Sequence, residues 1–153
     1  MHMKKAIMTI CVLAGLVVAV SGCIGQETTT FSGKYVTFEY PKDWNISNHQ
    51  TDPTGSPCEF VLLKNQEGEQ VASLAVFGGN VSLEDVESDV SVDCLGISDE
   101  GDIGDVHYVE YYSDEPRLHF YVFEKDGRPF VVSCDLLSDD VAKQIIESLK
   151  VKK

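Results

Sequence analysis

The chain has 153 residues, with 25 acidic and 12 basic side chains, and its formal net charge at neutral pH is −13. Such an acidic surface repels phosphate backbones and anionic lipid headgroups, so the charge excludes nucleic acid as a favoured partner. The length suits one globular domain behind a short leader.

The first 22 residues have the layout of a secretory signal. Lys4 and Lys5 give a positive start, and residues 6–20 are apolar apart from Thr9. The sequence VSGC at 20–23 then places two small residues before a cysteine, which resembles the lipobox of prokaryotic lipoproteins. In that family the cysteine takes a lipid and becomes the first mature residue. The resemblance predicts lipidation of Cys23, and an uncleaved signal anchor stays open as the alternative.

We therefore divide the chain into a signal peptide at 1–22, a lipidated cysteine with a flexible tether at 23–33, and a folded domain at 34–153. The tether contains Thr, Ser and Gly residues, which are typical of a flexible linker and offer little apolar surface to bury. This organisation predicts a lipid-anchored protein on the extracytoplasmic face of the cell membrane.

The first half of the domain shows strand patterns. Residues 35–40 alternate between apolar and polar side chains, which predicts a half-buried strand that ends at Pro41 because proline has no N–H to donate. Trp44 follows a turn and is predicted to be a core aromatic residue. Segments 58–65 and 69–79 predict a hairpin, whose second strand is apolar on both faces, as in a central strand.

The second half begins with a predicted helix that is capped by Ser82. The acidic segment at 99–105 is predicted to be a loop, and residues 106–113 a strand. Residues 117–137 form the clearest hairpin, since Asp126-Gly127 is a strong turn signal between two alternating segments.

The closing segment at 138–153 predicts an amphipathic helix that is capped by Ser138. Its apolar stripe consists of Val141, Ile145, Ile146 and Leu149. The order strands, helix, strands, helix predicts an α+β fold, in which helices pack on an antiparallel sheet.

Three features resemble the PsbP-like family: FEYPKDW at 38–44, the hairpin with its Asp-Gly turn, and AKQIIESLK at 142–150. The resemblance spans residues 31–151 and implies a three-layer α/β/α sandwich on a central, mainly antiparallel sheet. Plant and cyanobacterial members are extrinsic photosystem II subunits that help to retain calcium and chloride, and many related lipoproteins have no photosynthetic context. The family's opening motif, which is structural, maps onto Phe38, Tyr40, Pro41 and Trp44. No family metal or partner residue has a matching position, so none is carried over.

Catalytic patterns are missing from the sequence. It contains no G-x-S-x-G, no H-E-x-x-H and no phosphate-binding glycine loop. Three histidines follow the leader: His49, His107 and His119. His107 and His119 lie in predicted strands among apolar neighbours, where a structural role is favoured. We therefore expect no cofactor and no catalysis, and a binding or accessory module for a membrane or cell-surface partner.

A cation site is the alternative function. The acidic segment offers the hard oxygen ligands Asp99, Glu100, Asp102 and Asp105. Their spacing does not fit an EF-hand, so a solvated acidic loop is favoured and calcium binding stays open.

Asn45 and Asn80 each begin an N-x-Ser triplet beside a predicted turn. In an exported chain both are candidate N-glycosylation acceptors.

Three cysteines lie in the folded domain: Cys58, Cys94 and Cys134. Each is expected to face inward as a free thiol, Cys58 on the same face as Phe60 and Leu62. If one disulfide forms, we expect it to join Cys58 to Cys94.

Overall fold

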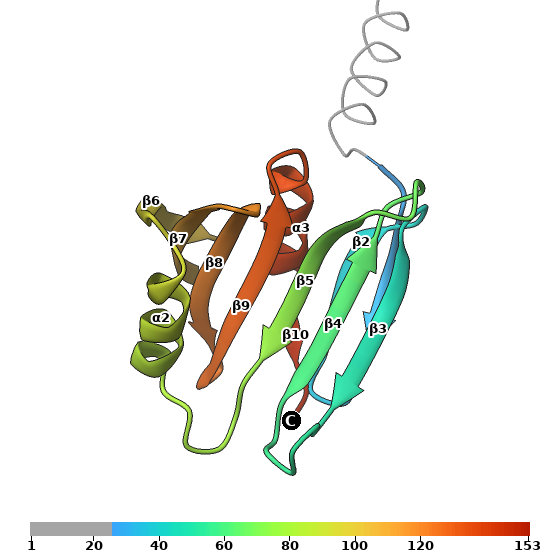
Figure 1. The fold of residues 1–153 in the computed structure, drawn as a ribbon. Coiled ribbons are helices and arrows are strands. Elements are labelled where there is room, and N and C mark those ends of the chain that lie inside the picture. Colours follow the sequence, from blue (N-terminus) through green and yellow to red (C-terminus); the bar gives the residue numbers. More distant parts are fainter. Residues whose placement is uncertain (1–25) are drawn as a thin grey trace, which may run out of the picture.

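A computed structural model describes residues 26–153, so the predicted signal peptide and the predicted lipidation of Cys23 lie outside the described residues. The described chain has ten strands and two helices (Figure 1). Within residues 26–153, no helix combines the length and the apolar character that crossing a membrane requires.

Seven antiparallel strands form the main sheet. In order across the sheet they are β3 (Asn45–Thr51), β4 (Glu59–Lys64), β5 (Gln70–Val76), β9 (Arg128–Asp135), β8 (Arg117–Lys125), β7 (Val106–Asp114) and β6 (Gly96–Ile103). Both predicted hairpins are confirmed, since β4 pairs with β5 and β8 with β9. Asp126 and Gly127 both have positive φ, as the tight turn between β8 and β9 requires.

A second, three-stranded sheet consists of β1 (Thr28–Ser32), β2 (Val36–Pro41) and β10 (Lys150–Val151), in the order β1-β2-β10. The predicted strand at 35–40 is confirmed as β2. The predicted tether at 23–33 is wrong from Thr28 onward, because β1 pairs along its whole length with β2.

The two described helices differ in how they begin. For α2 (Leu83–Val92) the predicted cap is confirmed: Ser82 Oγ accepts the Asp85 N–H at 3.1 Å, and the Asp85 carboxylate accepts the Ser82 N–H at 3.1 Å. For α3 (Asp139–Ser148) the predicted cap is wrong, since Ser138 makes no side-chain capping bond. Its ψ of 15° departs from the extended backbone that aims a capping oxygen at the first turn.

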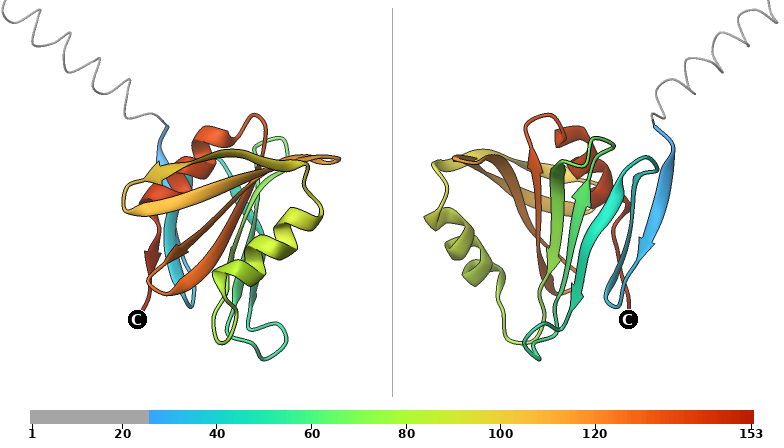
Figure 2. Two further views of the ribbon diagram at one scale, coloured as in Figure 1. Left: turned by 90° about the vertical axis from the view of Figure 1, so that its left-hand side faces the viewer. Right: turned by 45° about the vertical axis from the view of Figure 1, so that its right-hand side comes forward.

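The helices lie on opposite faces of the main sheet (Figure 2). On one face, α2 packs over β8 and β9. On the other face, α3 and the small sheet enclose the main core. Its large buried side chains include Phe38, Leu63, Leu74, Tyr121, Phe123, Phe130, Ile145, Ile146 and Leu149. The predicted stripe of α3 is therefore confirmed, with Val141 partly buried at its margin.

The predicted three-layer α/β/α sandwich is wrong, although the main sheet is antiparallel as expected. The layer on the α3 side is shared by one helix and a three-stranded sheet, and strands predominate in the described residues. Two strands that we did not predict, β3 and β6, form the edges of the main sheet. Their side chains are mostly exposed, so their sequences lack apolar alternation. The predicted acidic loop at 99–105 is mainly β6, where charges discourage pairing with another chain.

All three described cysteines are free. Cys134 is buried in β9, and burial raises the pKa of its thiol. Cys94 is half-buried beside α2. The inward orientation predicted for Cys58, Phe60 and Leu62 is wrong. Side chains alternate along β4, and the buried ones are the odd-numbered residues Glu59, Val61 and Leu63.

Glu59 is a fully buried carboxylate that joins the two sheets. It accepts the backbone N–H groups of Lys34 and Tyr35, each at 2.8 Å, and Oε1 lies 2.7 Å from Nε2 of His49. Gly33 lies so close to this carboxylate that a Cβ at that position would overlap it. The turn from β1 to β2 is therefore built around Glu59.

We expect Glu59→Ala to lower the free energy of unfolding by about 3–5 kcal/mol, because it removes a buried acceptor from two N–H groups and from His49. Urea denaturation measures this loss. Glu67→Ala, at an exposed position in the turn between β4 and β5, is the control and should change the value by less than about 0.5 kcal/mol. Similar losses in both variants would contradict the role of Glu59.

Candidate metal centre

The acidic side chains that we proposed as calcium ligands have separate partners. Asp99 accepts the hydroxyl of Tyr108 at 3.0 Å. Asp105 lies 3.3 Å from the ammonium of Lys125, on the neighbouring hairpin. Among the described residues, neither carboxylate belongs to a group of three converging ligand atoms.

The other two candidates, Glu100 and Asp102, hold one exposed histidine between them. His107 Nδ1 lies 2.8 Å from Asp102 Oδ1, and Nε2 lies 2.9 Å from Glu100 Oε1. The imidazole ring therefore separates the two carboxylates. The predicted acidic site does not converge, and His107 lies on an exposed edge and not among apolar neighbours.

The structure instead brings together Glu110, His119 and Asp139, whose ligand atoms lie within 4.8 Å of one another. Glu110 on β7 is opposite Tyr121 on β8, and His119 precedes Tyr121 by two residues on the same face. Asp139 is the first residue of α3, which covers this face. Three elements thus supply one ligand atom each.

The cluster contains ionisable side chains that are largely removed from water. Glu110 is only 6% exposed, and the His119 side chain is 20% exposed. Nδ1 of His119 lies against Oε1 of Glu110, but the two groups are not aligned as a hydrogen bond, and Nδ1 is a buried atom without a hydrogen-bond partner. An unsatisfied buried polar atom costs about 1–3 kcal/mol, which a bound cation would relieve.

Neighbouring side chains orient Asp139. The Tyr121 hydroxyl donates to Asp139, and burial together with this hydrogen bond raises the pKa of Tyr121, so the phenol stays a neutral donor. Lys143 lies 3.4 Å from Asp139. Burial opposes the charge of Lys143, but Asp139 outweighs it and raises the pKa of the ammonium. Both contacts restrain the Asp139 carboxylate, as supporting residues around a metal ligand do.

The donor set is one imidazole nitrogen and two carboxylates. Imidazole suits zinc and similar transition ions, and zinc accepts carboxylate oxygens at about 2.0–2.2 Å. Three protein ligands leave a fourth tetrahedral position for water or for a partner's ligand. Calcium fits less well, because it takes six to eight oxygen ligands.

Sequence reasoning missed this cluster for an identifiable reason. His119 was assigned a structural role, and Glu110 was not singled out within its strand. One signal was present: Glu110 occupies the same face of its strand as the buried Tyr108, where an acidic residue needs a partner. The partner itself depends on the register between β7 and β8 and on the place where α3 begins, which the sequence does not show.

The remaining predicted positions differ in their burial. The opening motif packs on or in the main core, with Phe38 and Pro41 buried and Tyr40 and Trp44 partly buried. The candidate glycosylation residues Asn45 and Asn80 are both exposed.

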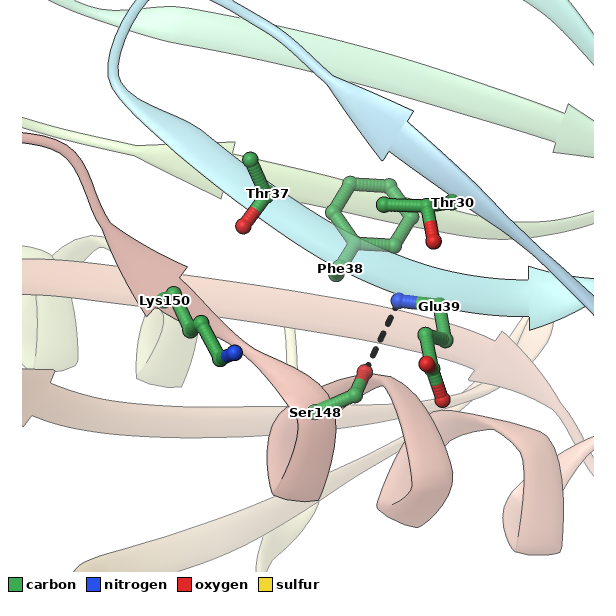
Figure 3. A pocket seen from close by; sticks show the side chains of 6 residues that line it. All are labelled: Thr30, Thr37, Phe38, Glu39, Ser148 and Lys150. Carbon is green, nitrogen blue, oxygen red and sulfur yellow. Dashed lines mark hydrogen bonds between the residues drawn. The ribbon is translucent and has the colours of Figure 1, made fainter.

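A cavity of about 230 Å³ lies between the small sheet and the end of α3 (Figure 3). Its lining consists of Thr30, Thr37, Phe38, Glu39, Ser148 and Lys150. Ser148 Oγ accepts the backbone N–H of Glu39 at 2.9 Å, which connects α3 to β2 across the cavity. The volume is below the range of about 300–1,000 Å³ that is usual for small-molecule pockets, and we assign no ligand to it.

No protein-family model matches the sequence, and no curated protein matches it. Among solved structures, a crystal structure of a Bacteroides thetaiotaomicron protein at 1.50 Å resolution matches with a TM-score of 0.50 and 19% sequence identity. The match covers 84% of this chain and 49% of the other, so the chain spans about half the length of that protein. At this identity the similarity concerns the fold alone, and the resemblance to the PsbP-like family stays a prediction.

The acidic neighbours of His107 give a testable pH dependence. Asp102 and then Glu100 raise the pKa of His107 above the ordinary value of 6.5. The protonated form therefore stabilises the β6–β7 edge at pH values below the unfolded pKa, and this contribution is lost as the pH rises through the higher folded pKa. NMR titration should give a midpoint above 6.5 that Asp102→Asn lowers and that Asp105→Asn leaves in place. A parent midpoint at or below 6.5 would contradict the pairing.

Proposed function

We propose that this chain is a membrane-tethered, extracytoplasmic binding or accessory module without catalysis of its own, and that it holds a divalent transition ion of the zinc class. The observation that carries the metal site is the convergence of Glu110, His119 and Asp139 from three separate elements. The lipobox-like sequence before Cys23 supports the tether. The metal departs from our expectation of no cofactor, since the sequence suggested only the acidic segment.

Charge within the cluster favours a cation there. Glu110 and Asp139 bring two carboxylates together at a partly buried position, where their repulsion is screened less than in water. His119 contacts Glu110, and Lys143 lies near Asp139, so each carboxylate has a separate partner. A divalent ion between the two carboxylates would neutralise both at once and would use Nδ1 of His119, which contacts Glu110 but makes no hydrogen bond.

We expect zinc to raise the melting temperature of the protein relative to chelator, and calcium to raise it much less. Free zinc at a hundred times its Kd would stabilise the folded state by about 2.7 kcal/mol. His119→Gln should abolish the zinc shift because it removes the nitrogen ligand. His107→Gln should keep the shift, since that histidine lies outside the cluster.

Differential scanning fluorimetry of the parent and both variants measures these shifts. Equal melting temperatures of the parent protein in zinc and in chelator would contradict the metal site. The cluster would then be an ion network that fixes α3 on the sheet.

The tether predicts a difference between two cysteines of the N-terminal segment. Cys23→Ser should give unprocessed or released protein, because serine offers no thiol for the lipid. Cys11→Ser is the matched control and should leave attachment and mature mass unchanged. Detergent partitioning and intact mass measure both properties. A Cys23→Ser variant with the parent's attachment and mature mass would show that the apolar segment itself is the anchor.

A further inference from the structure

The loop between β9 and α3 exposes two consecutive leucines. Leu136 is 42% exposed and Leu137 is 96% exposed. Leu95 and Ile97, at the start of β6, are 76% and 63% exposed. We call these four residues the apolar edge. Leu136 directly follows β9, which ends at Asp135.

The strand register places the four residues at one end of the main sheet. The backbone N–H of Leu95 donates to the carbonyl of Tyr112 at 2.8 Å. Next to Tyr112, Ser113 pairs with Leu118, and Leu118 pairs with Asp135. The start of β6 and the end of β9 therefore lie three strand spacings apart, about 14 Å.

The chain enters the domain at this same end. β1 begins at Thr28, and both views of Figure 2 show its start at the level of the loop between β9 and α3. Cys23 precedes Thr28 by five residues. An extended chain spans at most about 3.6 Å per residue, so Thr28 lies within about 18 Å of Cys23. A lipid on Cys23 would therefore hold this end of the domain at the bilayer.

We propose that the apolar edge, and Leu137 first of all, inserts into the surface of the bilayer to which the chain is tethered. This inference rests on the proposed lipid anchor. Two leucines alone bind a membrane weakly, but a short tether supplies a high local concentration of bilayer, so no further affinity is required.

The charge at this end indicates which lipid surface fits. The acidic residues of the neighbouring turns and helix start are Asp114, Glu115, Asp135, Asp139 and Asp140. They would be repelled by anionic headgroups. We therefore expect the apolar edge to insert into a zwitterionic or neutral lipid surface.

The test uses the full lipidated chain, reconstituted into phosphatidylcholine vesicles with brominated acyl chains, which quench nearby tryptophan. Leu137→Trp reports on the edge. Thr54→Trp is the matched control, at an exposed position between β3 and β4 at the opposite end of the sheet. The parent gives the background from its single tryptophan, Trp44. After this background is subtracted, we expect bromine to quench Leu137→Trp strongly and Thr54→Trp hardly at all. Replacing part of the lipid with phosphatidylglycerol should reduce the quenching.

Flotation of the same vesicles separates the two proposals. Protein that floats, with equal quenching in both variants, would overturn the edge proposal and leave the anchor standing. Protein that does not float would overturn the anchor and this inference with it. Leu137→Trp that is shielded from aqueous acrylamide but not quenched by bromine would show a protein occupant, either a partner or a second copy, and would also overturn the proposal.

Discussion

The buried carboxylate of Glu59 is the constraint on which the arrangement of the two sheets depends. A charged group that is removed from water must be fully paired, and Glu59 obtains its partners from the turn before β2 and from His49 on β3. Two backbone N–H groups of a turn are therefore satisfied by the first residue of β4. The close approach leaves no space for a side chain at Gly33. One side chain thus fixes the small sheet against the edge of the large one.

The position of the small sheet determines how the main core is closed. β2 and α3 cover the same face of the main sheet and contact each other, so the helix packs where the small sheet leaves room. Ser148 and Glu39 join them directly. Once α3 is fixed, its first residue Asp139 comes over β7 and β8, beside Glu110 and His119. The meeting of Glu110, His119 and Asp139 is therefore a consequence of how the helix covers the sheet.

The short loop between β9 and α3 links the two proposed activities. Leu136 and Leu137 belong to this loop, and Asp139 follows Leu137 by two residues. The loop that we propose to meet the bilayer thus also positions one residue of the proposed metal site. The loop between β9 and α3 lies at the same end of the main sheet as the start of β1 (Figure 1).

Much of the fold could be predicted, because most interior strands and both helices have a recognisable pattern in their own sequence. The hairpin of β8 and β9 has alternating apolar residues around Asp126-Gly127, and the beginning of α2 has the Ser82 cap. The edge strands β3 and β6 carry no such signal, because an exposed strand has no face that must be apolar. β1 is likewise polar, and only its pairing with β2 reveals it as a strand. The expected sandwich failed because β1, β2 and β10 form a second sheet beside α3.

The sequence by itself determined the acidic charge, the lipobox-like segment, most of the interior strands and both helices, because each depends on composition or on local spacing. Only the tertiary structure decided which polar residues meet. Glu110 and Asp139 are 29 positions apart and are joined by a strand register and by the packing of α3. The four exposed residues of the apolar edge come from two segments that are separate in sequence: the start of β6 and the loop after β9. Such contacts depend on which faces pack together, and that is set by the burial of the whole core and not by any single segment.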